Sequence, residues 1–192
     1  MEKNNIFPGG EPPRFPRWDD LPDIELYMDQ VIALMSKYFE MLGLQDDKAL
    51  TPSMINNYVK MGVLPSPVKK KYSKNHLAHL FIICMLKQVL PLQGISALIK
   101  AQLRGKSEQQ LFDCLSLAYE DIFTREMKEY SELFDCLAAE ESDLESVFSM
   151  FAFRAAAVSN YARIVSERAV SSIDEKDQPE EKTEKKEKPE KK

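Results

Sequence analysis

Apolar residues recur at steps of three and four along most of the chain, a spacing that predicts helices rather than strands. The first run covers residues 24–42, and the acidic residues and proline within residues 19–22 indicate a helix start at that point. Gly43 stands in the C′ position at which many helices end. The apolar members of this run are Ile24, Met28, Val31, Met35, Tyr38 and Leu42.

A short helix and a turn are predicted next. Thr51 and Pro52 form an N-cap and N1 pair, and Gly62 is placed to end the helix that they begin. Pro65 and Pro67 prevent its continuation, so residues 63–71 are predicted to form a turn with an extended basic segment.

Two further helices are predicted before residue 106. Ser73 is the expected cap of a helix that runs to about residue 89. Pro91 precedes another helix, which Gly105 ends.

Two long helices are predicted to follow. Ser107 with Gln110, and Ser142 with Glu145, have the spacing of capping boxes at their starts. The second helix has an apolar seam over almost four heptads, which is typical either of packing in an intramolecular bundle or of a coiled-coil-like dimer seam. The sequence leaves both alternatives open. The seam consists of Leu144, Phe148, Phe151, Ala155, Val158, Ala162, Val165 and Ala169.

The two ends of the chain differ from the middle. Residues 1–19 are rich in proline and predict an extended arm, held to the folded body by Phe15 or Trp18. Residues 174–192 contain eight acidic residues, seven lysines and no apolar residue, which predicts a disordered tail. Between them, residues 20–106 and 107–173 are the two expected folded regions.

The composition favours an all-α fold of about six helices. Hydrophobic residues make up 44% of the 192 residues, and six glycines are few for a turn-rich sandwich or barrel. Cys84, Cys114 and Cys136 lie in apolar helical patterns and are odd in number, so we expect reduced, buried thiols in a cytoplasmic protein. Residues 77–92, the most apolar run, are too few for a membrane span, and residues 1–18 lack the apolar core of a secretion signal.

Charge divides the chain sharply. Residues 51–106 carry nine lysines and arginines and no acidic residue, although the whole chain has a formal net charge of −5, so the remainder sums to −14. Such a partition is typical of a protein with one face that meets a polyanion. The simpler alternative is that these lysines only keep the stretch soluble.

The order of residues in this basic stretch resembles a known family. Thr51, Pro52, Ile55, Tyr58 and the run Gly62-Val63-Leu64-Pro65, followed by Lys71-Tyr72-Ser73 and Leu77, are similar to the winged helix-turn-helix of MerR-type transcription regulators. The chain resembles in particular an uncharacterised bacterial domain-of-unknown-function family that shares this half, over most of residues 20–170.

The resemblance implies that residues 52–61 form a recognition helix in the major groove and that residues 68–72 form a wing, within a MerR-like domain of residues 20–106. Asparagine suits an adenine edge, and lysine suits guanine or phosphate. The expected base-reading residues are Ser53, Asn56, Asn57 and Lys60, and the expected phosphate contacts are Lys69, Lys70, Lys71 and Lys74.

Other chemistries have weaker support in the sequence. His76 and His79 are three residues apart on one helix, but two ligands are too few for a metal site, so we expect surface or boundary histidines. No Gly-rich phosphate loop or catalytic triad pattern is present, and we expect neither an enzyme nor a cofactor. An effector pocket among Phe148, Phe151, Phe153 and Tyr161 is a further hypothesis, although most such clusters are core.

The sequence therefore predicts a homodimeric regulator that binds double-stranded DNA. The alternative is a helical adaptor that keeps the helix-turn-helix fold, binds a protein partner and does not bind DNA. The salt dependence of DNA binding distinguishes the two.

Overall fold

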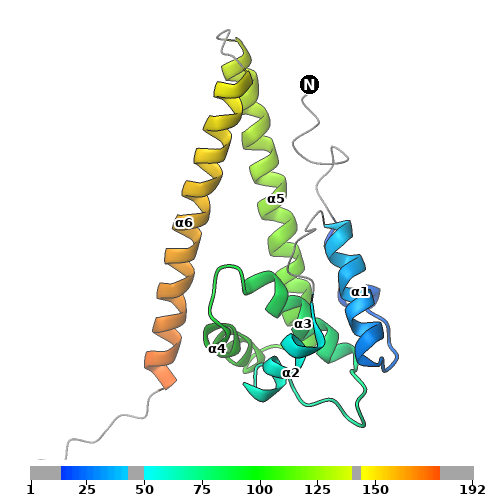
Figure 1. Ribbon diagram of the computed structural model, residues 1–192. Helices are drawn as coiled ribbons and strands as arrows, with labels where there is room; N and C mark the ends of the chain where they lie inside the picture. The colour runs from blue at the N-terminus through cyan, green and yellow to red at the C-terminus, as the bar shows by residue number, and fades with distance from the viewer. Residues whose placement is uncertain (1–13, 43–49, 140–143, 178–192) are drawn as a thin grey trace, which may run out of the picture.

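The computed structural model describes residues 14–42, 50–139 and 144–177. These residues form a short 3-10 helix and six α-helices, and the all-α prediction is confirmed (Figure 1). The elements are η2 (Trp18–Asp20), α1 (Met28–Met41), α2 (Pro52–Lys60), α3 (Lys74–Leu86), α4 (Leu92–Leu103), α5 (Glu108–Ala139) and α6 (Leu144–Asp177).

Helix α3 is the centre of the fold. Every residue from His76 to Cys84 is buried, and the helix packs against α1, α4 and α5. A helix that is apolar all round needs neighbours on every side, which explains this central position. Phe81 joins three of the helices, because its ring lies 5.8 Å from that of Phe39 on α1 and 5.5 Å from that of Phe112 on α5.

Residues 14–27 form an N-terminal strap that is held against α5, as the sequence predicted for Phe15 and Trp18. The Phe15 side chain is fully buried, and its ring stacks on that of Tyr119 at 5.2 Å. The Trp18 backbone N–H donates a 2.7 Å hydrogen bond to Asp113, and the Ser116 hydroxyl donates a 2.7 Å bond to the carbonyl of Pro16. The strap therefore brings residues 15–18 against α5, about 100 residues later in the sequence.

The predicted start of the first helix is wrong. Helix α1 begins at Met28, and Ile24, expected on its apolar seam, is 65% exposed. Residues 21–27 are not helical, and Leu26 among them exchanges two backbone hydrogen bonds with Tyr72, of 2.9 and 2.8 Å. A helix at Leu26 would have to give up this long-range pairing. Gly43, the predicted helix end, lies outside the described residues.

Most later helix boundaries follow the local signals, although α3 ends at Leu86, before the predicted end at about residue 89. The Thr51 side chain accepts a bond from the Met54 N–H, and Gly62 has the positive φ of 69° that its C′ position requires. Ser107 and Gln110 form the predicted capping box at the start of α5. Ser142, predicted to cap α6, lies outside the described residues.

Helices α5 and α6 run antiparallel; they lie close together at the C-terminal end of α5 and the N-terminal end of α6, and they separate toward their other ends (Figure 1). Where the two helices lie close together, the ring of Phe151 on α6 packs against that of Tyr130 on α5. Toward its other end α6 rests on α4, where a Cβ at Gly94 would lie 3.2 Å from Val170. Glycine thus permits close approach of these two helices. Helix α6 continues to Asp177, so it includes the first four residues of the region predicted as a disordered tail. Glutamate and lysine in these residues are compatible with a helix.

The described part of the chain contains no strand beyond two isolated pairs, Leu26 with Tyr72 and Val68 with Lys71. None of its helices combines the length and the apolar character needed to cross a membrane.

Candidate nucleic-acid interface

Helix α2 separates its two faces as the sequence predicted. Pro52 occupies the first helical position and the Thr51 side chain caps the N-terminus. Ile55 and Tyr58 are buried, and burial raises the pKa of Tyr58 to about 12, so this phenol stays neutral. The polar side chains that were predicted to read bases are all exposed, namely Ser53, Asn56, Asn57 and Lys60.

Residues 68–71 form a tight two-residue turn, here called the basic turn. The Lys71 N–H donates a 2.9 Å hydrogen bond to the Val68 carbonyl, and the two residues between them project at the tip. Lys69 and Lys70 have φ angles of 49° and 63°. A type I′ turn requires positive φ at both central residues, positions that ordinarily favour Asn and Gly. Both lysine side chains are exposed.

The strap engages the two remaining lysines of the predicted set. The Lys71 ammonium lies 3.7 Å from the Glu25 carboxylate and 5.8 Å from the ring centre of Tyr27. The Lys74 ammonium lies 5.2 Å from the ring centre of Trp18. The structure therefore separates the predicted lysines into a freely exposed pair, Lys69 and Lys70, and a pair that contacts the strap. Nothing in the local sequence linked these partners, because they are 44 to 56 residues apart.

His76 fixes the segment that carries the basic turn. Its Nδ1 accepts a 3.0 Å hydrogen bond from the Ser73 N–H, while its Nε2 lies 3.4 Å from the Ser66 carbonyl. These partners require the neutral ring with its proton on Nε2. Burial is the main cause that lowers the pKa of His76. The buried position corrects the prediction of a surface or boundary histidine.

We expect this histidine to make stability depend on pH. The folded-state pKa of His76 lies below its ordinary 6.5, so the unfolded chain takes up the proton first. Stability should therefore be highest above pH 6.5 and should fall as the pH drops through the lowered pKa. Replacing His76 with Gln keeps a side-chain acceptor for the Ser73 N–H and removes the titration. Urea unfolding at pH 7.5 and pH 5 should show a larger loss in wild type than in His76→Gln, whereas equal losses would contradict this role.

The second histidine contacts α5. The His79 Nε2 lies 2.7 Å from the Glu108 carboxylate and the side chain is 5% exposed, so it too is a buried residue. This contact ties α3 to the start of α5. Within the described ranges, no three His, Cys, Asp or Glu residues gather in a way that would hold a metal ion.

The prediction of three buried thiols is correct only for Cys84. Burial raises its pKa to about 11, which makes it a poor nucleophile. Cys114 and Cys136 are exposed. Although Phe112 is buried, a side chain two residues further along a helix points to nearly the opposite side. An apolar neighbour in sequence was therefore a poor guide to the burial of Cys114.

The predicted aromatic effector pocket on α6 does not form. Phe151 is buried against Tyr130, but Phe153 and Tyr161 are 72% and 71% exposed. These rings do not converge on one cavity.

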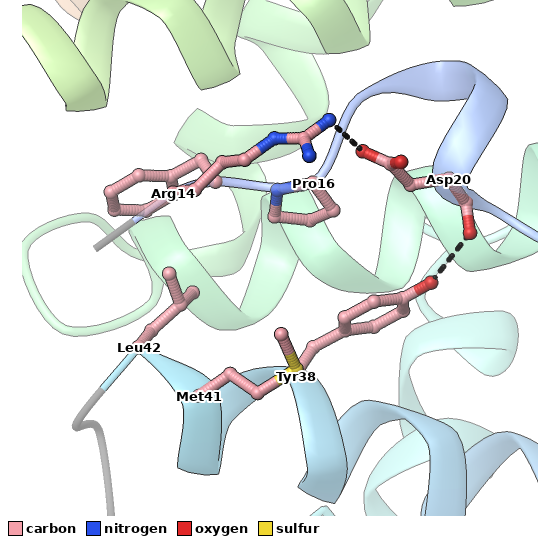
Figure 2. A pocket seen from close by; sticks show the side chains of 7 residues that line it. Arg14, Pro16, Asp20, Tyr38, Met41 and Leu42 are labelled. Carbon is pink, nitrogen blue, oxygen red and sulfur yellow. Dashed lines mark hydrogen bonds and ion pairs between the residues drawn. The ribbon is translucent and has the colours of Figure 1, made fainter.

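An open hollow of about 210 Å³ lies instead between the strap and α1 (Figure 2). Its polar groups bond to one another: Arg14 donates to the Asp20 carboxylate, and the Tyr38 hydroxyl donates to the Asp20 carbonyl at 2.9 Å. We interpret this hollow as the junction between strap and helix.

The fold and the surface define a small all-helical protein that presents a polar helix and an exposed lysine turn from an acid-free segment. Residues 16–122 match the family described as "Domain of unknown function (DUF1836)", and the chain belongs to this family. No curated protein and no solved structure matches the chain.

Proposed function

We propose that the protein is a transcription regulator that binds duplex DNA, with α2 as a MerR-like recognition helix and the basic turn as the wing. The observation that carries this proposal is the conformation of Lys69 and Lys70. A residue with a β-carbon costs about 1 kcal/mol or more in the left-handed region, and such strain is concentrated at functional sites. Two adjacent lysines in this conformation place two charges at the tip of one tight turn.

The surrounding charge supports a polyanion as the partner. No carboxylate occurs in residues 51–106, so no acidic side chain of this segment competes for the exposed lysines. The acid-rich remainder carries a net −14, which favours approach of DNA by this segment alone. A flexible loop of lysines kept for solubility would not need the left-handed backbone.

The exposed face of α2 has the groups needed to read bases. Asn56 and Asn57 each offer a donor and an acceptor, the pair that an adenine edge accepts in the major groove. Lys60 suits guanine or a phosphate. The Asn57 amide lies 3.4 Å from the Met61 sulfur, a weak contact that a base edge would replace.

Binding to random-sequence and genomic duplex fragments at several salt concentrations tests the proposal. Three to five lysines on phosphates in each protomer of a dimer predict a log-log salt slope of about −5 to −9. Absence of binding at low salt would overturn the proposal and favour the protein-interaction adaptor. A steep salt slope would justify selecting the operator sequence from a pool of duplex DNA fragments.

On a selected operator, Asn56→Ala should relax discrimination at a single base pair. Loss of a bidentate contact costs about 1–3 kcal/mol against the preferred base and leaves the salt slope unchanged. Competition binding with operators mutated one position at a time measures this effect. Gln109→Ala, at an exposed position of α5, is the matched control and should retain full discrimination. Uniform weakening on all sequences would place Asn56 on a phosphate instead.

A further inference from the structure

Helix α6 exposes an apolar stripe, here called the outer stripe, that consists of Met150, Phe153, Ala157, Tyr161 and Ile164. These residues follow one another at steps of three and four, which places them on one side of the helix. The four large side chains are 51%, 72%, 71% and 41% exposed, respectively. Two aromatic rings left this open within four turns of one helix are unusual for a chain without a partner.

The outer stripe is distinct from the side of α6 that meets its own chain. Phe151 packs against Tyr130, and Arg154 forms an ion pair with Glu129, so these α6 residues face α5. Val170 meets Gly94 on α4. On a helical projection Ala157, at the centre of the outer stripe, is turned by about 120° from Phe151 and by about 140° from Val170, while Arg154 lies at the edge of the stripe, about 60° from Ala157.

The apolar seam that the sequence predicted on α6 lies on the other side of the helix from the outer stripe. Of its described members only Phe151 is buried, while Val158 and Val165 remain 40% and 46% exposed. The contacts of α6 within the chain therefore leave the middle of this helix uncovered.

The order of residues along the outer stripe is symmetric about Ala157. Phe153 and Tyr161 lie four residues to either side, and Met150 and Ile164 lie seven residues to either side. A two-fold axis at Ala157 would therefore oppose Phe153 to Tyr161 and Met150 to Ile164 of an antiparallel second helix. Alanine at the centre permits the helices to approach closely where they cross. This is the self-complementarity that an isologous interface requires.

The parts of the chain outside the described residues lack the composition to cover the outer stripe. Residues 178–192 contain no apolar residue, and residues 43–49 contain only one leucine and one alanine. Residues 1–13 contain three large apolar residues, among three prolines and two glycines that oppose a helix.

We infer that a second copy of this chain covers the outer stripe, and that two α6 helices pair antiparallel with Ala157 on the two-fold axis. The inference concerns a surface other than α2 and the basic turn, and its test needs no DNA. Failure of one proposal is therefore distinguishable from failure of the other.

Sedimentation equilibrium of the full chain, with Phe153→Glu and Tyr161→Glu combined in one variant, provides the first test. Loss of a buried aromatic anchor weakens an interface by about thirtyfold or more, and each substitution occurs twice in a symmetric dimer. The dimer dissociation constant should rise at least about a thousandfold. Ser159→Glu, an exposed position on the opposite side of α6, should leave the dimer intact. A monomeric wild type, or a variant that remains dimeric, would overturn the inference.

Disulfide trapping tests the antiparallel arrangement in a near-native chain and does not depend on the folding of the glutamate variant. The background replaces the exposed Cys114 and Cys136 with Ser. A mixture of Phe153→Cys and Tyr161→Cys chains should form a mixed disulfide on oxidation, at least tenfold more than either chain alone. Ala157→Cys should form a disulfide with itself. Parallel pairing would link each single-cysteine chain to itself instead, and no disulfide in any mixture would reject the interface.

Discussion

Alanine in place of Phe81 should lower the free energy of unfolding by about 3–5 kcal/mol, a large fraction of the total for a domain of this size. The Phe81 side chain is fully buried and its ring touches three others. Phe39 stacks on it, while Tyr38 and Phe112 meet it edge to face, at 6.5 and 5.5 Å respectively. Removal of this ring leaves a cavity between α1, α3 and α5, which neighbouring aromatic side chains are too rigid to fill.

Urea unfolding followed by circular dichroism at fixed protein concentration measures this change. Leu117→Ala is the matched control, because Leu117 is 56% exposed on α5 and alanine is a good helix former. The control should change stability by about 0.5 kcal/mol or less. A loss below about 1 kcal/mol for Phe81→Ala would show that the three helices do not share this core.

Removal of the two charges at the tip of the basic turn should sharply weaken DNA binding. Each phosphate contact contributes about 0.9 to the log-log salt slope, so loss of two lysines should reduce the slope by about 1.8 per protomer. If the variant and the wild type bind equally at 1 M salt, this difference in slope makes the variant bind about 60-fold more weakly per protomer at 0.1 M salt. Lys71→Ala should have a smaller effect, because Glu25 and Tyr27 already engage that ammonium.

The choice of replacement separates charge from folding. Lys69→Asn combined with Lys70→Gly places the preferred residues of a type I′ turn at the two positions with positive φ. This variant should be at least as stable as wild type, so a loss of binding would be due to charge. A control with Arg125→Gln and Lys128→Gln removes two positive charges from exposed ion pairs on α5. Equal weakening by both variants would contradict a local role for the turn.

Under the proposed function, the contacts of Lys71 and Lys74 with the strap would couple DNA binding to residues 18–27. Trp18 and Tyr27 lie beside these ammonium groups, and Asp113 and Glu120 on α5 hold the strap in place. A duplex that contacted either lysine would have to compete with an aromatic ring. Lys69 and Lys70 are therefore the main phosphate contacts that the proposed function predicts.

Local rules were sufficient for much of the fold and of the candidate site. Thr51 with Pro52, and Ser107 with Gln110, predicted helix starts because capping depends on residues within one turn. The exposed and buried faces of α2 followed from the helical repeat alone. Exposure of Asn56 and burial of Tyr58 were predictable for that reason.

Features that depend on distant residues were not predictable in this way. Helix α1 starts at Met28 because Leu26 pairs with Tyr72, 46 residues later. The apolar neighbours of Cys114 concealed its exposed position, which follows from the way α5 is turned against α3 and the strap.

The sequence by itself determined most of the helices and the caps of α2 and α5, the acid-free basic stretch and the polar face of α2, because each of these depends on composition or on spacing within a few residues. Only the tertiary structure decided which lysines remain free and which side of α6 is left uncovered. Those outcomes depend on how the strap and α5 pack against segments far away in the chain, and local periodicity carries no information about such contacts.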